Sequence, residues 1–241
     1  MRKLGMAVAA VAGLLAMGVL GRTGDAAQAG ATITGKVKFT GARPVMRKID
    51  MSDEAVCQHK YPTPPTEESV MVNGNGTLAN VFVYVKAGVP ASYHAPAAPP
   101  PVLLDQNGCR YHPHVFGLMV GQTLQIKNSD GMLHNIKAKG VKNRPFNISQ
   151  PTKMTTPRTF SAAEVMVPLE CNVHGWMTAF VGVLPHPFFA VTGADGGFTI
   201  KGLPPGTYTI EAWHEKYGTQ TATVTVTGSG AKTADFTFAA H

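Results

Sequence analysis

The sequence predicts an all-β protein, and three features of the chain support this prediction. Helical periodicity is nearly absent after residue 30. Short runs rich in Val, Thr, Ile, Phe and Tyr alternate with clusters of Gly, Pro, Asn and Asp, which is the pattern of a β-sandwich or barrel. Only Ser52–Gln58 reads as a helix, with Ser52 as its N-cap and acidic residues behind it.

Eight segments carry the clearest strand pattern, and turn residues bound each of them. They are Thr32–Phe39, Val81–Lys86, Thr123–Lys127, Glu164–Leu169, Ala179–Leu184, Gly197–Ile200, Tyr208–His214 and Gln220–Thr227. Two proline-rich breaks divide the chain, at Ala95–Pro101 and at Pro185–Pro187. Because proline cannot donate to a sheet ladder, we expect connectors there.

The N-terminus, residues 1–29, reads as a signal peptide. Arg2 and Lys3 precede an apolar run from Leu4 to Leu20, and Ala27–Ala29 fits a small-residue cleavage site. An uncleaved membrane anchor is the alternative, although Gly and Ala make the run weakly apolar. No cysteine directly follows the run, so a bacterial lipid anchor has no attachment point. We therefore expect a periplasmic or secreted protein with no membrane span after cleavage.

The net charge of +7 is spread along the chain without a Lys/Arg run. No basic stripe with interleaved aromatic residues is present, so nucleic-acid binding has little support. A mildly basic surface would instead steer an acidic protein partner, such as a cytochrome, toward this chain.

The segment Cys171-Asn-Val-His174-Gly-Trp-Met177 carries the most chemistry. It places a thiol, an imidazole and a thioether within seven residues, and His134 supplies a second imidazole upstream. Two His nitrogens, a Cys thiolate and a weak axial Met are the ligands of a blue-copper electron-transfer centre. A complete ligand set leaves no open position for a substrate. We therefore expect one type 1 copper ion, one-electron chemistry and no enzymatic activity.

Other interpretations of these four residues remain open. Cys171 could be a buried structural thiol, His174 a hydrogen-bonded loop histidine and Met177 a core side chain. Zinc also binds Cys and His, although structural zinc sites rarely use Met.

The chain has three cysteines, which is an odd number for an oxidising compartment. With Cys171 assigned to the metal, Cys57 and Cys109 are the candidate disulfide pair. Two unpaired thiols are the alternative.

His112 and His114 raise the question of a second metal site, because residues two apart in a strand share a face. Pro113 between them indicates a bulge or a sheet edge instead.

Residues 101–186 resemble the cupredoxin family, specifically its amicyanin- and plastocyanin-like blue-copper members. The resemblance rests on the Cys-x2-His-x2-Met loop with its upstream His134, and on the stretch from Tyr111 to Asn128. It implies a Greek-key β-sandwich with His134, Cys171, His174 and Met177 as copper ligands. Trp176 is a departure, because such loops usually carry a smaller aromatic residue.

Residues 187–241 resemble the carboxypeptidase regulatory-like family, whose modules are immunoglobulin- or transthyretin-like β-sandwiches and are usually non-catalytic. The resemblance rests on Thr192–Ile200 and on Gly202–Ile210, a Pro/Gly turn followed by an alternating strand. Strands that normally open such a module, at 33–39 and 80–86, lie before the proline connector. We therefore expect one split domain, residues 30–100 and 187–241, interrupted by a cupredoxin domain at 101–186. Three consecutive pieces are the alternative, and few candidate stacking rings support carbohydrate binding.

The cupredoxin resemblance implies electron transfer between redox partners, such as a c-type cytochrome and a periplasmic dehydrogenase. Two further functions remain open: a copper carrier or assembly factor without redox turnover, and an envelope interaction module with structural copper.

Overall fold

A computed structural model describes Met1 and residues 30–95 and 99–240. The predicted signal peptide, apart from Met1, and residues 96–98 of the proline connector lie outside the described residues. In the described part of the chain, no helix has both the length and the apolar character needed to cross a membrane.

The described residues form two β-sandwiches, and each of the eight predicted strands overlaps an observed one. We call the two sandwiches the central and the flanking sandwich. One sheet of the central sandwich has the strand order β10 (Phe146–Gln150), β9 (His134–Ala138), β12 (Glu164–Glu170), β13 (Thr178–Leu184) and β7 (Val115–Met119). The other sheet has the order β11 (Met154–Arg158), β8 (Leu124–Asn128), β5 (Val102–Gln106) and β6 (Tyr111–His112).

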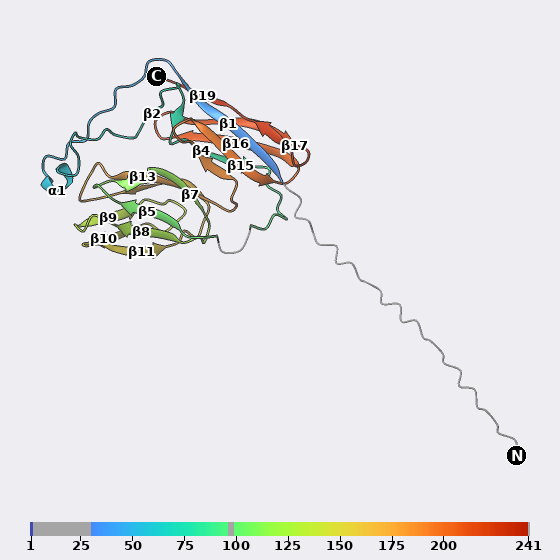
Figure 1. Cartoon of the computed structure of the whole chain (residues 1–241), viewed down its shortest axis with the longest axis horizontal. Coiled ribbons are helices and arrows are strands. Elements are labelled where there is room, and N and C mark those ends of the chain that lie inside the picture. The colour runs from blue at the N-terminus through green and yellow to red at the C-terminus, as the bar shows by residue number, and fades with distance from the viewer. Residues whose placement is uncertain (2–29, 96–98, 241) are drawn as a thin grey trace.

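The flanking sandwich combines strands from both ends of the chain (Figure 1). One of its sheets has the strand order β14 (Phe189–Val191), β4 (Phe82–Ala87), β16 (Gly206–His214) and β17 (Gly218–Val226). The other sheet has the order β15 (Gly197–Leu203), β1 (Ala31–Thr40) and β18 (Ala231–Thr233), and β19 (Phe236–Ala239) also pairs with β1. A two-stranded hairpin, β2 (Met71–Val72) and β3 (Leu78–Ala79), completes the N-terminal part. Strands β1 and β4 therefore find their sheet partners beyond residue 188.

Alternation of side chains produces the core of the central sandwich. In β8, Leu124, Ile126 and Asn128 are buried, whereas Gln125 and Lys127 are exposed. Residues from both central sheets then form one apolar cluster that includes Leu104, Ile136 and Val181. A strand with one buried face is pinned in register, because a shift by one residue would turn its apolar side chains to solvent.

The two sandwiches also pack on each other through a further apolar cluster. It joins β4 and β16 of the flanking sandwich to β7 and β13 of the central one. Its buried members are Phe82, Tyr84, Val115, Met166 and Leu184. Gly182 permits this contact, because a Cβ atom there would overlap the Phe82 ring. The four sheets are therefore stacked as successive layers (Figure 1).

Residues 47–67 form an irregular strap that lies against the central sandwich. Backbone hydrogen bonds from Ile49 to Pro65 (2.8 Å) and from Glu67 to Arg47 (3.0 Å) close its base. Ile49, Met51 and Cys57 of the strap belong to the core of the central sandwich.

The strap contains the helix α1 (Ala55–Gln58), which is shorter than the predicted helix over Ser52–Gln58. The predicted cap is wrong, because the N-cap residue is Glu54 and makes no side-chain capping bond. Ser52 instead donates its backbone N–H to the Asp50 carboxylate (2.9 Å), which holds it in a turn before the helix.

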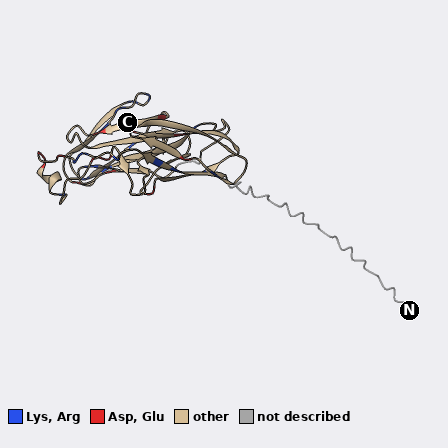
Figure 2. Cartoon of the chain, turned by 90° about the horizontal axis from the view of Figure 1, so that it is seen from above, with Lys and Arg blue, Asp and Glu red and all other residues tan. Residues whose placement is uncertain are grey.

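Charged residues of both signs are interspersed over the two sandwiches (Figure 2). Several are paired, including Arg47 with Glu67 (2.6 Å) and Arg110 with Glu68 (2.6 Å).

Candidate metal centre

A short loop between two paired strands carries three of the predicted ligands. Cys171 directly follows β12, and Met177 directly precedes β13. The Cys171 N–H donates to the Met177 carbonyl (3.2 Å), and the Met177 N–H donates to the His174 carbonyl (3.0 Å). These bonds hold the loop as a tight turn, and His134 opens the neighbouring strand β9.

The side chains of His134, Cys171 and His174 converge at the end of the central sandwich. The Nδ1 atoms of the two histidines are 3.0 Å apart, and Cys171 Sγ lies 3.8 Å from His174 Nδ1. The three side chains are buried, and a metal-ligand atom of each lies within 4.8 Å of the others. The structure therefore brings these three predicted residues together.

These separations fit a bound metal ion. Nitrogens at about 2 Å from a common ion lie roughly 3 Å apart, and a thiolate at about 2.3 Å lies roughly 3.5–4 Å from them. Met177 is 1% exposed and belongs to the same apolar cluster as Cys171. Its thioether is thus enclosed in the core at the base of the loop.

The environment favours the ionised form of Cys171. Burial raises the pKa of this thiol, but hydrogen bonds with His134 and His174 oppose burial and bring the pKa down to about 5. The thiolate is the form that binds a metal. Cys171 is also the only free cysteine among the described residues.

Asp130 orients His134, a role that its place in an acidic turn of the sequence does not indicate. His134 donates its Nε2–H to the Asp130 carboxylate (2.9 Å), which also accepts the N–H groups of Gly108 and Cys109 and pairs with Lys60 (2.9 Å). Burial raises the pKa of Asp130, but these hydrogen bonds lower it by more, so the carboxyl is ionised. With Nε2 occupied, Nδ1 is the nitrogen that faces Cys171 and His174. Carboxylate partners of this kind are typical of metal-ligating histidines.

Asn135 joins its strand to the Cys171 loop. Its Oδ1 accepts the backbone N–H of Asn172 (2.6 Å) and lies 3.3 Å from Cys171 Sγ. Its Nδ2 donates to Asn147 (2.5 Å) on β10. The amide is therefore fixed at both ends and limits movement of the thiolate.

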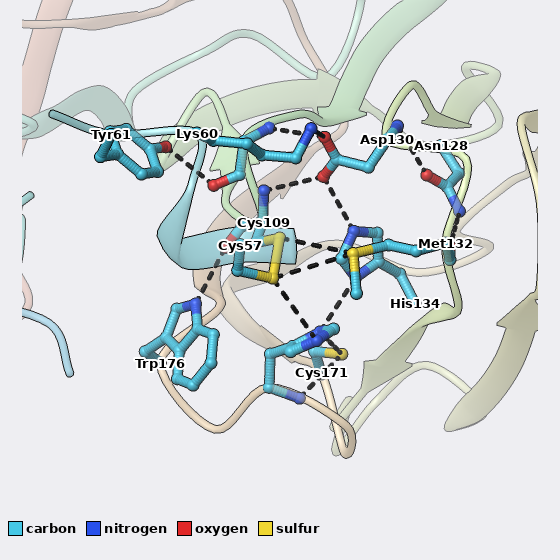
Figure 3. Close-up of a disulfide and its surroundings, with 12 residues drawn as sticks. Cys57, Lys60, Tyr61, Cys109, Asn128, Asp130, Met132, His134, Cys171 and Trp176 are labelled. Carbon is cyan, nitrogen blue, oxygen red and sulfur yellow. Dashed lines mark hydrogen bonds and ion pairs between the residues drawn. A yellow bond between two sulfur atoms is a disulfide. The ribbon is translucent and has the colours of Figure 1, made fainter. Parts of the chain in front are cut away.

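Cys57 and Cys109 form a disulfide (Figure 3). The disulfide lies against the other edge of His174. Cys57 Sγ is 3.8 Å from His174 Nε2. Trp176 covers a further side: its Nε1–H donates to the Cys109 carbonyl (2.9 Å), and its ring centroid lies 5.2 Å from that of His174. The disulfide closes a loop with a sequence separation of 52 residues. Such a loop is worth about 4 kcal/mol of unfolding free energy in the chain-entropy model.

His112 and His114, the candidates for a second metal site, lie in different environments. His112 is exposed. His114 is buried, with Nδ1 on the Thr178 carbonyl (3.0 Å) and Nε2 on the Glu215 carboxylate (2.8 Å). Neither belongs to a potential metal-ligand group among the described residues.

Comparison with known families finds one match. Residues 181–239 match the family model of the carboxypeptidase regulatory-like domain. The matched stretch begins within β13 and contains β14 to β19, which all belong to the flanking sandwich. A comparison with curated proteins finds no match.

Among solved structures, similar chains include cupredoxins. An oxidised amicyanin mutant is 20% identical (TM-score 0.31), with 42% of this chain and 97% of amicyanin covered. A purple cupredoxin from Nitrosopumilus maritimus is 21% identical (TM-score 0.30), with 34% and 98% covered. A copper-containing nitrite reductase from Thermus scotoductus is 21% identical (TM-score 0.33), with 40% of this chain covered. This chain spans only 25% of that reductase. Both families that the sequence resembles thus recur in these comparisons.

Proposed function

We propose that this chain binds one copper ion through His134, Cys171 and His174, with Met177 as a weak axial donor, and that it carries single electrons between envelope redox proteins. The observation that supports this proposal most is the convergence of two imidazole Nδ1 atoms and one cysteine sulfur, all from buried residues. When bound, copper would supply reversible one-electron chemistry, which this ligand set suits.

The surroundings of the three ligands suit electron transfer. Asp130 holds the His134 ring, Asn135 holds the thiolate loop, and the strands on either side are paired within one sheet. A centre whose ligands move little between two oxidation states needs little reorganisation when an electron arrives. Trp176 and the disulfide cover His174, so substrate access is restricted, which favours a carrier over an enzyme.

The partners are proposed on the same basis. A redox protein such as a c-type cytochrome or a periplasmic dehydrogenase would exchange electrons with this centre. The N-terminal sequence supports a periplasmic or secreted location, where such proteins meet. Because His174 is fully buried, we place the exchange at Trp176, the partly exposed ring beside it.

The flanking strands support a matching domain organisation. We propose that residues 30–100 and 187–241 form one carboxypeptidase regulatory-like domain, interrupted by a cupredoxin domain at residues 101–186. The supporting observation is that β1 and β4 pair with β15, β16, β18 and β19, all from the second flank.

A copper carrier that uses the same ligands without redox turnover is the second candidate. Its support is the deep burial of the ligands, which suits retention of an ion as well as electron transfer. Voltammetry of the copper-loaded protein separates the two. A reversible one-electron wave with rapid exchange toward a cytochrome is expected for the electron carrier. Absence of a reversible wave while copper stays bound would contradict that function and favour the carrier of copper.

A further inference from the structure

Three sulfur atoms meet behind His174, on the side away from Cys171 (Figure 3). They belong to Cys57, Cys109 and Met132. Met132 Sδ lies 3.8 Å from Cys57 Sγ and 3.7 Å from Cys109 Sγ. Both cysteines are fully buried, and Met132 is partly buried.

The spacing matches a soft metal ion surrounded by sulfur. Three sulfurs at about 2.3 Å from one ion in a plane lie roughly 4 Å apart. Two of the three separations already have this value, and only the covalent bond holds the third pair closer. Thiolates bind both Cu(I) and zinc, and the thioether favours Cu(I), because structural zinc sites are built from Cys and His.

Imidazole rings border the sulfur cluster on two sides. His174 turns Nδ1 toward Cys171 and Nε2 toward Cys57, each at 3.8 Å from the cysteine sulfur. Its ring therefore lies between Cys171 and the sulfur cluster. On the other side, Cys109 Sγ lies within 4.8 Å of ligand atoms of Asp130 and His134.

We propose that the Cys57–Cys109 disulfide masks a second metal site, and that its reduction opens a Cu(I) site formed by Cys57, Cys109 and Met132. Reduction by a dithiol transfers two electrons and two protons, so that one disulfide and one dithiol become two protein thiols and the disulfide of the reductant. Binding of Cu(I) then displaces the two thiol protons and adds the Met132 thioether. The oxidised protein holds one copper ion and the reduced protein two.

The burial of the disulfide sets when this site can form. Both cysteines are fully buried and Cys57 belongs to the strap, so a reductant acts when this strap opens or before the chain has folded. The second site would thus bind Cu(I) next to His174 before the disulfide closes. The proposal of a sulfur site rests on the proposed function only in taking the ion bound at Cys171 to be copper.

Cu(I) titration against a chromogenic Cu(I) chelator tests the proposal. The full chain is denatured, reduced with a phosphine and refolded without oxygen, and is compared with the same protein after reoxidation. We expect two tightly bound Cu(I) ions per reduced chain and one per oxidised chain. One ion per chain in both states would overturn the proposal.

Two variants locate the second ion. The double variant C57S/C109S should bind one ion whatever its history. Met132→Leu keeps both cysteines and the volume of the side chain, and should weaken only the second ion, by roughly tenfold. An unchanged second affinity in this variant would overturn the three-sulfur site even where the double serine variant fails to fold.

Cys171→Ser separates this proposal from the proposed function. We expect that variant to keep the reduction-dependent ion and to lose the other. Suppose that the oxidised wild-type protein binds no copper, whereas the reduced protein binds one ion that Cys171→Ser retains. This result would contradict the proposed function and still support the sulfur site. Loss of the reduction-dependent ion in Cys171→Ser would contradict the separate site.

Discussion

His134 donates its Nε2–H to the Asp130 carboxylate across 2.9 Å, and this bond decides which ring nitrogen faces His174 and Cys171. The same carboxylate accepts two backbone N–H groups from Gly108 and Cys109. One buried anion thus joins a proposed metal ligand to the turn that carries the disulfide.

Replacement of Asp130 should therefore change the metal more than the fold. In Asp130→Asn the amide can still contact His134, but the negative charge that supports the imidazole is lost. We expect Cu(II) affinity to fall about 10–100-fold. If this loss falls on Cu(II) alone, the reduction potential rises by about 60–120 mV.

Equilibrium copper competition and voltammetry measure both effects. The matched control is Glu211→Gln, because Glu211 is another buried carboxylate, paired with Lys86 (2.5 Å) in the flanking sandwich. Asp130 would have no role at the metal if its variant kept the wild-type potential and affinity.

Met177 provides a second prediction. Met177→Leu retains the volume of this buried side chain but removes the thioether donor. We expect copper to remain bound and the potential to rise, because a neutral donor stabilises Cu(II) more than Cu(I). A tenfold selective loss for Cu(II) would correspond to about 59 mV. Met119→Leu, a change at another buried methionine, should leave the potential unchanged. A potential that stayed constant or fell in Met177→Leu would exclude Met177 as the axial ligand.

His114 links the two sandwiches and should make stability depend on pH. Its two ring nitrogens face the Thr178 carbonyl and the Glu215 carboxylate, which are both acceptors, so the pair is complete only when the ring is protonated. Burial lowers the pKa of His114, but Glu215 raises it by more, and the net pKa lies above the usual value. The stabilisation is therefore fully present below the unfolded-state pKa of about 6.5 and disappears as the pH rises through the folded-state pKa.

Urea unfolding of wild type and His114→Gln at pH 5.5 and pH 8.5 measures this effect. We expect the variant to be less stable by roughly 2 kcal/mol at the lower pH, and the difference to shrink at the higher pH. Glu215→Gln should behave in the same way. A difference that grew with pH would show that the His114 ring is neutral in the folded protein.

The pairing of β1 and β4 predicts the behaviour of the C-terminal flank alone. Residues 187–241 contain β14 to β19 but lack β1, which pairs with β15, β18 and β19, and β4, which lies between β14 and β16. We expect this fragment to show no cooperative thermal transition and poorly dispersed amide signals. A joined chain of residues 30–94 and 187–240 restores both strands and should regain cooperativity. Cooperative unfolding of residues 187–241 by themselves would require an independent domain and end the split-domain proposal.

The sequence predicted the strands and the loop that carries Cys171 and His174, because both depend on local patterns. His134 opens the neighbouring strand β9, so its place beside this loop depends on the sheet as well. Alternation of apolar residues defines β8, and the spacing from Cys171 to Met177 defines a loop between two strands. The strap was harder to predict, because the Asp50 carboxylate accepts the N–H of Ser52, and the helix begins only at Ala55.

Other features depend on contacts between distant segments. Asp130 resembles any acidic turn residue until the fold places it beside His134. The contact between the sandwiches did leave a signal: β4 is buried at Phe82, Val83, Tyr84 and Val85 in succession. An unbroken apolar run of this kind indicates a strand covered on both faces, and the second face lies against the central sandwich.

The visible spectrum of Cu(II)-loaded wild type beside Cys171→Ser tests the central claim most directly. We predict an intense thiolate-to-copper band at one copper ion per oxidised chain, and loss of that band in the serine variant, because a hydroxyl does not replace the soft thiolate. The Cys57–Cys109 disulfide remains in both proteins and contributes no free thiol. A wild-type protein without this band, or a Cys171→Ser variant that kept it, would contradict a blue-copper centre built on Cys171.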